Sequence, residues 1–177
     1  MADAKLTALS EDTAPTSDDL VYVVNDPAGT PGSKKVTLAN LIKGLGAAWT
    51  AYTPTLTNIT IGNGTLDFSY LQIGKLVIVR GKFTFGSTSS ISGLMTFSLP
   101  VTSVAAHNTF YQATGQIEDN GTTEYMATLT QETTTTVSVS AIGTSGTYGQ
   151  RVSTSSTVPM TWATNDAFRV LFIYEAA

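Results

Sequence analysis

Side chains that could carry acid–base chemistry are few in this chain, and their spacing brings none of them together. The single histidine, His107 in VAAHNTF, has no second histidine and no acidic residue beside it in sequence, which gives poor support for a general acid or base. Two carboxylates that meet in space can hydrolyse a glycosidic bond, but nothing in the sequence marks such a pair. We expect no catalytic residue and no enzyme activity. The carboxylates that follow Trp49 are Asp67, Glu118, Asp119, Glu124, Glu132, Asp166 and Glu175.

Signatures of cofactor and metal sites are also missing from the sequence. Cysteine is absent, which excludes disulfide bonds, thiolate catalysis and zinc sites built on cysteine. The chain contains no Gly-x-Ser-x-Gly elbow, no phosphate-binding glycine loop and no His-Glu-x-x-His helix. We therefore expect neither a cofactor nor a bound metal.

The segment GTSGTYGQR supplies the best candidate for a binding surface. Tyr148 combines an apolar ring with a polar hydroxyl group, and Gln150 and Arg151 follow it closely. This combination suits contact with a sugar face or a protein surface. We predict a receptor-contact loop at Tyr148, Gln150 and Arg151. The alternative, that Tyr148 only anchors its own loop, stays open.

The chain is acidic and carries few charged residues. Its formal net charge is -4 and its isoelectric point is near 4.7. Only 12% of its residues are charged, against roughly 25% in ordinary globular proteins. After Lys82 the basic residues are Arg151 and Arg169 alone, too few for a groove that follows a phosphate backbone. We expect no nucleic-acid partner.

Membrane insertion and secretion are not expected from the sequence. No apolar run approaches the roughly 20 residues that cross a bilayer as a helix. The opening MADAKLTALSEDTAPTSDD lacks the basic start and the apolar stretch of a secretory signal. We expect the chain to be made in a cytoplasm.

From Trp49 to Ala177, short strand patterns follow one another without a helical period. Asn63-Gly64 and Asn120-Gly121 are strong hairpin signals, and Gly74 predicts a turn before KLVIVRGKFTFG. Three further runs, TTVSVSAI, STVPMTWAT and AFRVLFIY, also predict strands. The Thr-rich residues 131–157 predict a strand followed by a loop. This pattern indicates an antiparallel β-sandwich or a jelly-roll-like domain at residues 49–177.

Two of the expected strands carry apolar residues on both faces. In AFRVLFIY, Leu171 and Ile173 oppose a second apolar set on the other face, so this strand is expected at the centre of a sheet or at a subunit contact. KLVIVRGKFTFG is expected to start buried on both faces, with Leu76 and Ile78 opposite Val77 and Val79, and to end half solvated. The second apolar set in AFRVLFIY is Phe168, Val170, Phe172 and Tyr174.

Residues 1–48 predict a separate N-terminal arm with one short strand and one short α-helix. The strand is expected at LVYVV, residues 20–24. Thr37 is placed as the N-cap of the helix, and one helical stripe follows it. A helix this short is not stable alone in water. Its stripe must therefore pack on the core of its own domain, on copies of itself or on a docking partner. The stripe is Leu38, Leu41, Ile42 and Leu45.

The arm and helix together, KLTALSEDTAPTSDDLVYVVNDPAGTPGSKKVTLANLIKG, resemble the N-terminal segment of many tail-fibre-like and other virion proteins of tailed bacteriophages. The shared features are the DDLV strand, the D-P-x-G-T turn and K-K-V-T-L-A-N-L. The module from WTAYTPTL to Y-x-x-x-G-K-x-V-x-V-R-G looks like a β domain of phage surface proteins. The resemblance covers roughly residues 5–93.

That resemblance implies a structural protein at the virion surface, assembled in the cytoplasm of a bacterial host. It implies a homo-oligomer, usually a trimer, whose N-terminal segment docks on another virion protein of the capsid or the tail. The β domain then faces outward, where it can contact a glycan or a protein of the host surface. Since the chain lacks the repeats of a long shaft, a short fibre or a head decoration protein is expected. The alternatives are a capsid cement with a purely stabilising role and a glycan-degrading spike.

Overall fold

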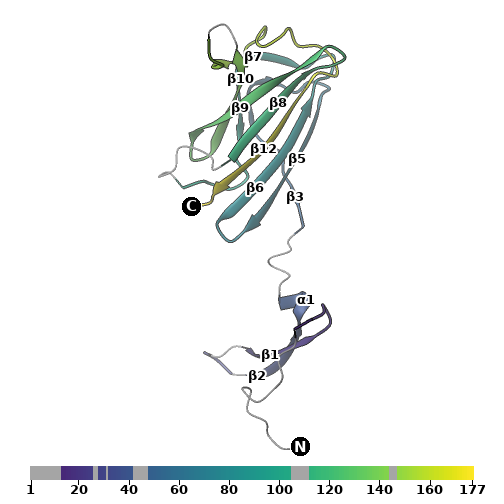
Figure 1. Cartoon of the computed structure of the whole chain (residues 1–177), viewed down its shortest axis with the longest axis vertical. Helices are drawn as coiled ribbons and strands as arrows, with labels where there is room; N and C mark the ends of the chain where they lie inside the picture. Colours follow the sequence, from purple (N-terminus) through teal and green to yellow (C-terminus); the bar gives the residue numbers. More distant parts are fainter. Residues whose placement is uncertain (1–12, 26–27, 31, 42–47, 105–111, 144–146) are drawn as a thin grey trace, which may run out of the picture. The chain divides into compact units, whose positions relative to one another are not determined.

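The computed structural model describes residues 13–25, 28–30, 32–41, 48–104, 112–143 and 147–177. The chain divides into two compact units, Met1–Ala47 and Ala48–Ala177, which we call the N-terminal unit and the β domain (Figure 1). The boundary expected from the sequence lies one residue further on. Over the described ranges, no helix combines the length and the apolar character needed to cross a membrane.

The N-terminal unit is a two-stranded antiparallel sheet followed by one helical turn. Strand β1 (Leu20–Asn25) pairs with β2 (Gly32–Thr37), and α1 (Leu38–Leu41) follows directly. Thr37 caps the helix as predicted, because its Oγ1 accepts a hydrogen bond from the amide nitrogen of Asn40 at 3.2 Å. The first strand and the helix are therefore confirmed. The second strand was not predicted, because GSKKVT has little apolar alternation and is held by backbone pairing with β1.

The β domain is one antiparallel sheet of ten strands that curls into a half-barrel (Figure 1). Neighbouring strands follow the order β3-β5-β6-β12-β8-β9-β10-β7-β4, and β11 pairs with β10. Strand β12 is therefore central, as predicted. The strands are β3 (Thr50–Ala51), β4 (Leu56–Thr60), β5 (Thr65–Ile73), β6 (Leu76–Thr84), β7 (Ser90–Ser98), β8 (Gln112–Asp119), β9 (Thr123–Thr133), β10 (Thr136–Gly143), β11 (Gln150–Ser153) and β12 (Ala167–Glu175).

The inner face of the curled sheet holds the hydrophobic core. Phe68 on β5 and Phe97 on β7 come from strands near opposite ends of the strand order, yet their ring centres are 5.5 Å apart. Phe172 on the central strand lies 5.9 Å from Phe97. The sheet therefore closes over its own apolar face, which buries that face without a second sheet. The predicted antiparallel β class is confirmed, whereas one continuous sheet stands where a sandwich or jelly roll was expected.

The two Asn-Gly pairs have different roles. Asn120-Gly121 turns the β8–β9 hairpin, in which Asp119 lies opposite Thr123, as predicted. Asn63-Gly64 does not make the predicted hairpin, because β4 pairs with β7 while β5 pairs with β6 and β3. Here the turn carries the chain from one end of the strand order toward the other. The side chain of Asn63 holds this crossing in place: its Oδ1 accepts hydrogen bonds from the amide and the hydroxyl group of Thr88, both at 2.9 Å.

Of the remaining local predictions, the turn at Gly74 is confirmed and the strand at STVPMTWAT is wrong. Gly74, with φ of 58°, turns β5 into β6 as expected. In the described part of residues 131–157, the end of β9, β10 and β11 form strands, where one strand followed by a loop was expected. STVPMTWAT forms no strand: Val158 makes only an isolated bridge with Ser155, since the following proline has no amide hydrogen for a ladder.

Candidate functional site

The predicted docking stripe is exposed where the structure describes it. Leu41 at the end of α1 is 51% exposed, and Leu38 is half-buried. Ile42 and Leu45 lie outside the described residues. The helix therefore presents at least one large apolar side chain that its own unit does not cover.

The N-terminal unit has no core of its own among its described residues. None of residues 13–23, 28–30 and 32–41 has a buried side chain. Leu20 and Tyr22 on β1 are 57% and 68% exposed, although the Tyr22 hydroxyl group shares a 2.8 Å hydrogen bond with Ser33. A two-stranded hairpin is at best marginally stable in water. The described part of the unit therefore leaves its largest apolar side chains exposed.

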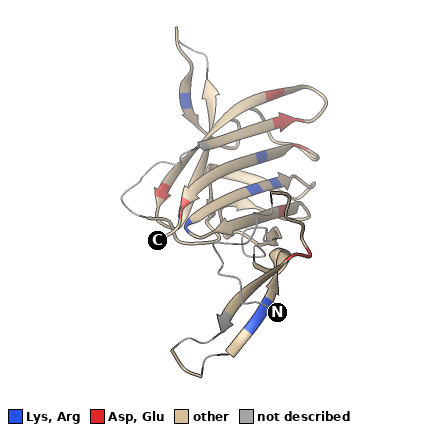
Figure 2. Cartoon of the chain, turned by 60° about the horizontal axis from the view of Figure 1, so that its bottom comes forward, with Lys and Arg blue, Asp and Glu red and all other residues tan. Residues whose placement is uncertain are grey.

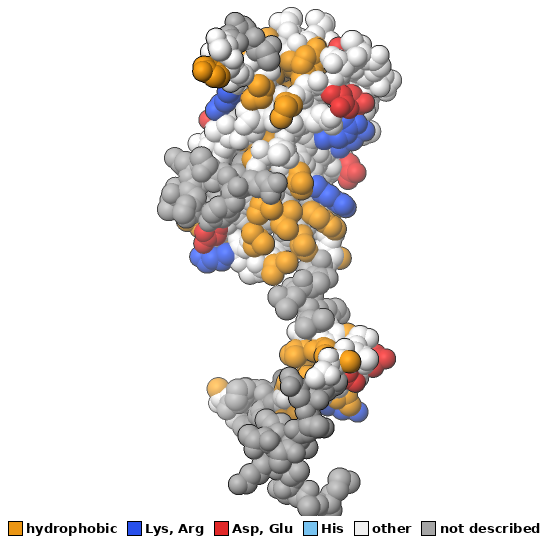
Figure 3. Space-filling view, in the orientation of Figure 1, with side chains coloured by type: hydrophobic (Ala, Val, Ile, Leu, Met, Phe, Trp, Pro, Cys, Tyr) orange, Lys and Arg blue, Asp and Glu red, His pale blue; other side chains and the backbone are white. Residues whose placement is uncertain are grey.

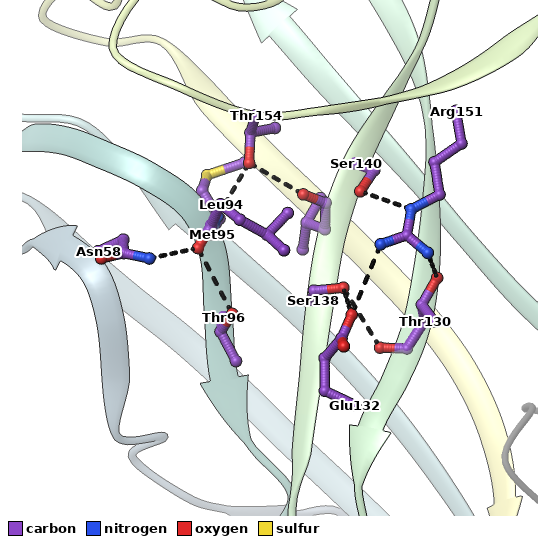
Figure 4. Close-up of polar contacts among 11 residues, drawn as sticks. Asn58, Leu94, Met95, Thr96, Thr130, Glu132, Ser138, Ser140, Arg151 and Thr154 are labelled. Atoms are coloured by element: carbon purple, nitrogen blue, oxygen red, sulfur yellow. Dashed lines mark hydrogen bonds and ion pairs between the residues drawn. The ribbon is translucent and has the colours of Figure 1, made fainter.

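The structure separates the three residues of the predicted receptor-contact loop. Tyr148 is 81% exposed. Gln150 is also exposed, and it pairs through its backbone with Gly143. Arg151 extends along the sheet, where its Nε donates to the Ser140 hydroxyl group at 3.1 Å (Figure 4). Its guanidinium group also binds Thr130 and lies 3.5 Å from a carboxylate oxygen of Glu132. Tyr148 and Gln150 are free to meet a ligand, whereas Arg151 is already occupied.

An apolar groove opens where two strands separate. Strand β10 pairs with β9 only as far as Ala141 opposite Ala127, and then continues with β11. The gap has a volume of about 470 Å³. Met126 at its edge is 76% exposed. The groove is lined by Glu124, Tyr125, Met126, Ala141, Ile142, Gly143, Val152, Val158 and Pro159.

A second apolar surface, missed as a site by the sequence reasoning, lies on the outer face of β5, β6 and β12. Leu76 and Leu171 are 41% and 46% exposed, so the expectation that β6 starts buried on both faces is wrong. Figure 3 shows hydrophobic side chains gathered at the end of the β domain near the β5–β6 turn. The signal in sequence was the apolar second face of AFRVLFIY. We call this surface the outer apolar patch; it consists of Leu71, Ile73, Leu76, Ile78, Leu171 and Ile173, which lie on the same face of the three neighbouring strands.

Two carboxylates of the β domain have structural partners. Glu118 forms an ion pair with Arg169. Asp166 accepts hydrogen bonds from the amide nitrogens of Asn120, at 3.0 Å, and Ala163, at 2.6 Å. Across the described ranges, no three His, Cys, Asp or Glu side chains gather as a metal site would require. His107 lies outside the described residues.

Two buried tyrosines have altered acidity. Burial raises the pKa of the Tyr52 hydroxyl group, and the charge on Tyr174 adds to this effect. Burial likewise raises the pKa of Tyr174, although a hydrogen bond with Val101 opposes the change. The Tyr174 hydroxyl group donates to the Val101 carbonyl at 2.8 Å, whereas Tyr52 Oη has no hydrogen-bond partner among the described atoms. Both groups belong to the packing of the half-barrel.

No protein-family model matches the chain, and no curated protein or solved structure matches it either.

Proposed function

We propose that this chain is a structural protein of a tailed-phage virion. Its N-terminal unit docks on another virion protein, and its β domain faces outward as a short fibre or a decoration protein. The resemblance of residues 5–93 to phage surface proteins suggests this role. The proposal predicts no catalysis and no cofactor.

The observation that carries the proposal is the uncovered N-terminal unit. Its described residues include no buried side chain, and they expose Leu20, Tyr22 and Leu41. Fixing a backbone costs about 1–2 kcal/mol per residue, and a unit without a core cannot offset that cost alone. A protein surface that covers these three side chains supplies the missing burial, at roughly 25 cal/mol for each Å² of apolar area. Docking on a virion partner or on other copies of the chain meets this need.

The outer apolar patch supports a homo-oligomer. A stable protein interface buries about 800 Å² on each partner, with an apolar centre and a polar rim. Six neighbouring aliphatic side chains on three strands form such a centre, and polar side chains surround them. We propose that copies of the β domain meet through this patch, in a trimer of the kind that the phage resemblance implies. A capsid or tail protein is the alternative occupant.

Two roles of the displayed domain remain to be separated by experiment. In the first, exposed residues such as Tyr148 and Gln150 contact the host surface. In the second, the domain only stabilises the capsid, and its outer loops bind nothing. Antibodies against residues 48–177 can be used for gold labelling of particles released from the bacterial host that makes the chain. Label on the tail supports host contact, and label on the head supports decoration; particles without any label would contradict the proposal.

A substitution in α1 tests the docking step directly. We expect Leu41→Asp to leave the β domain folded, as judged by circular dichroism, but to remove the protein from purified particles. Lys35→Asp is the matched control, because Lys35 is exposed on β2 of the same unit, and it should leave incorporation intact. If Leu41→Asp unfolds the whole chain instead, the helix belongs to the core of the protein and the docking role is lost.

A further inference from the structure

A shallow groove crosses the strands on the outer face of the β domain and shares Leu171 with the outer apolar patch. One hollow of about 310 Å³ is lined by Asp67, Arg80, Gly81, Lys82, Arg169 and Val170. A second, of about 270 Å³, is lined by Thr114, Gly115, Gln116, Arg169, Val170 and Leu171. The two hollows share Arg169 and Val170 on the central strand. Together they span β5, β6, β12 and β8, and we call the two hollows the transverse groove.

Basic side chains concentrate at this groove. The β domain has five Lys and Arg residues in all, and three of them, Arg80, Lys82 and Arg169, line the groove. Arg169 lies directly opposite Lys82, while Arg80 is two residues before Lys82 and on the same face. Figure 2 shows the basic positions of β6 beside that of β12. In a chain with a net charge of -4, this cluster is a local attraction for an anion.

Two of the three cations, Arg80 and Arg169, are held in place by neighbouring side chains. Arg80 Nε donates to the Ser69 hydroxyl group at 2.8 Å, and its Cζ lies 4.3 Å from the centre of the Trp49 ring. Its terminal nitrogens have no partner among the described residues, and neither does the Lys82 amine. Arg169 is bound to Glu118 and is within 3.4 Å of Gln116 Oε1. A guanidinium group fixed in this way loses little entropy when it meets a carboxylate.

We propose that the transverse groove binds an acidic oligosaccharide, a chain of sugar rings that carry carboxylate groups. Arg80 and Lys82 bind a carboxylate through charge-assisted hydrogen bonds. The Thr114 hydroxyl group and the Asp67 carboxylate also line the groove, and their oxygens can accept hydrogen bonds from sugar hydroxyl groups. Trp49, 39% exposed beside Arg80, offers an apolar surface for a ring. Since neighbouring strands are about 4.8 Å apart, a path across four strands suits an elongated ligand.

The charges around the groove favour a saccharide with spaced carboxylates, rather than a nucleic acid, as the ligand. Asp67 lines the groove and Glu118 lies beside it on Arg169. A continuous phosphate backbone would meet these carboxylates along its length, whereas a sugar polymer can place hydroxyl groups there. The proposal rests on the display of the β domain proposed above. Binding by the free protein needs no particle, however, so its failure would leave the docking role of the N-terminal unit untouched.

The test uses isothermal titration of the full chain with tetragalacturonate, and with maltotetraose as a neutral oligosaccharide of the same length. We expect heat of binding with the acidic sugar only. The double variant Arg80→Gln and Lys82→Gln should weaken binding by about tenfold or more, because each lost charged hydrogen bond costs a substantial part of the affinity. The control Lys34→Gln and Lys35→Gln removes the same charge from exposed positions of β2 and should bind like the parent chain.

Each other outcome overturns the proposal. Absence of binding at millimolar tetragalacturonate, or equal binding of maltotetraose, would remove the acidic-sugar assignment. If the Lys34→Gln and Lys35→Gln control lost as much affinity as the Arg80→Gln and Lys82→Gln variant, overall charge, and not the groove, would attract the ligand. Tighter binding of an oligothymidylate of eight nucleotides, with the same loss in the Arg80 and Lys82 variant, would assign the groove to nucleic acid. Circular dichroism of both variants confirms that the sheet is intact.

Discussion

At the scale of single residues, Tyr52 and Tyr174 show how one chemical group can differ in its contribution to stability. Both hydroxyl groups are removed from water, but only Tyr174 is paired, donating to the Val101 carbonyl and accepting from the Val101 amide at 3.3 Å. We expect Tyr174→Phe to lower the free energy of unfolding by about 1–2 kcal/mol, since it leaves buried backbone groups without partners. Tyr52→Phe should cost nothing or stabilise slightly. Urea unfolding of the two variants measures this difference, and equal losses would contradict it.

The same tyrosines predict an alkaline limit of stability. Because burial raises the pKa of each in the folded chain, the unfolded chain releases these protons first, near the ordinary tyrosine pKa of about 10. Their contribution to the free energy of unfolding is complete below that pH. Above it, the free energy of unfolding falls by at most about 1.4 kcal/mol per pH unit for each group. Urea unfolding between pH 9 and pH 11 should show a shallower fall in Tyr52→Phe than in the parent.

At the scale of the elements, the sequence predicts the features that depend only on residues close together in the chain. Thr37 as a helix cap, the Gly74 turn and the Asn120-Gly121 hairpin follow from backbone geometry within a few positions. The pairing of β4 with β7 does not follow in this way, because Leu56 lies opposite Phe97, far along the chain. The Asn63-Gly64 signal was therefore read correctly as a turn but wrongly as a hairpin. Long-range pairing, driven by burial of the inner face, decides which strand lies beside β4.

A matched pair of substitutions distinguishes the two Asn-Gly turns. Asn63 binds the loop at Thr88 through its side chain, with a further 3.1 Å hydrogen bond from its Nδ2 to Ser87. Asn120 is exposed, and it is bound through its backbone amide, which donates to Asp166. Asn63→Ala should therefore lower the free energy of unfolding by about 1–2 kcal/mol. Asn120→Ala should change it by no more than about 0.5 kcal/mol. Thermal or urea unfolding gives both values, and a loss at Asn63 no larger than that at Asn120 would show that the side-chain contacts of Asn63 are unimportant.

The candidate sites were less predictable than the elements. Leu171 and Ile173 indicated a central strand or a subunit contact, and the structure confirms the central position. The position of Arg151 could not be inferred, because Ser140, Thr130 and Glu132 surround it only once β9, β10 and β11 are paired. The transverse groove could not be inferred from the sequence for the same reason. Arg80 and Arg169 are far apart in sequence and become neighbours through the pairing of β6 with β12.

At the scale of the whole molecule, the chain has two kinds of apolar surface. The inner face of the half-barrel buries its aromatic residues within one copy. The outer apolar patch and the uncovered N-terminal unit cannot be buried within either unit as described. Acidic proteins with few charges have little repulsion between copies to oppose association. The composition, the half-barrel and the exposed patches are thus consistent with a chain that completes its burial on assembly.

The outer apolar patch makes this argument testable. The double variant Leu76→Glu and Leu171→Glu changes two side chains that are already 41% and 46% exposed in one copy, so it should leave the fold intact. Facing copies of the patch would then place like charges together in a desolvated contact, which costs several kcal/mol. We expect sedimentation velocity to show an oligomer for the parent chain and a monomer for the variant. Met126→Glu, at a position 76% exposed outside the patch, should remain oligomeric. A parent chain that sediments as a monomer at all concentrations would assign the patch to another virion protein, and a variant that stays oligomeric would move the subunit contact elsewhere.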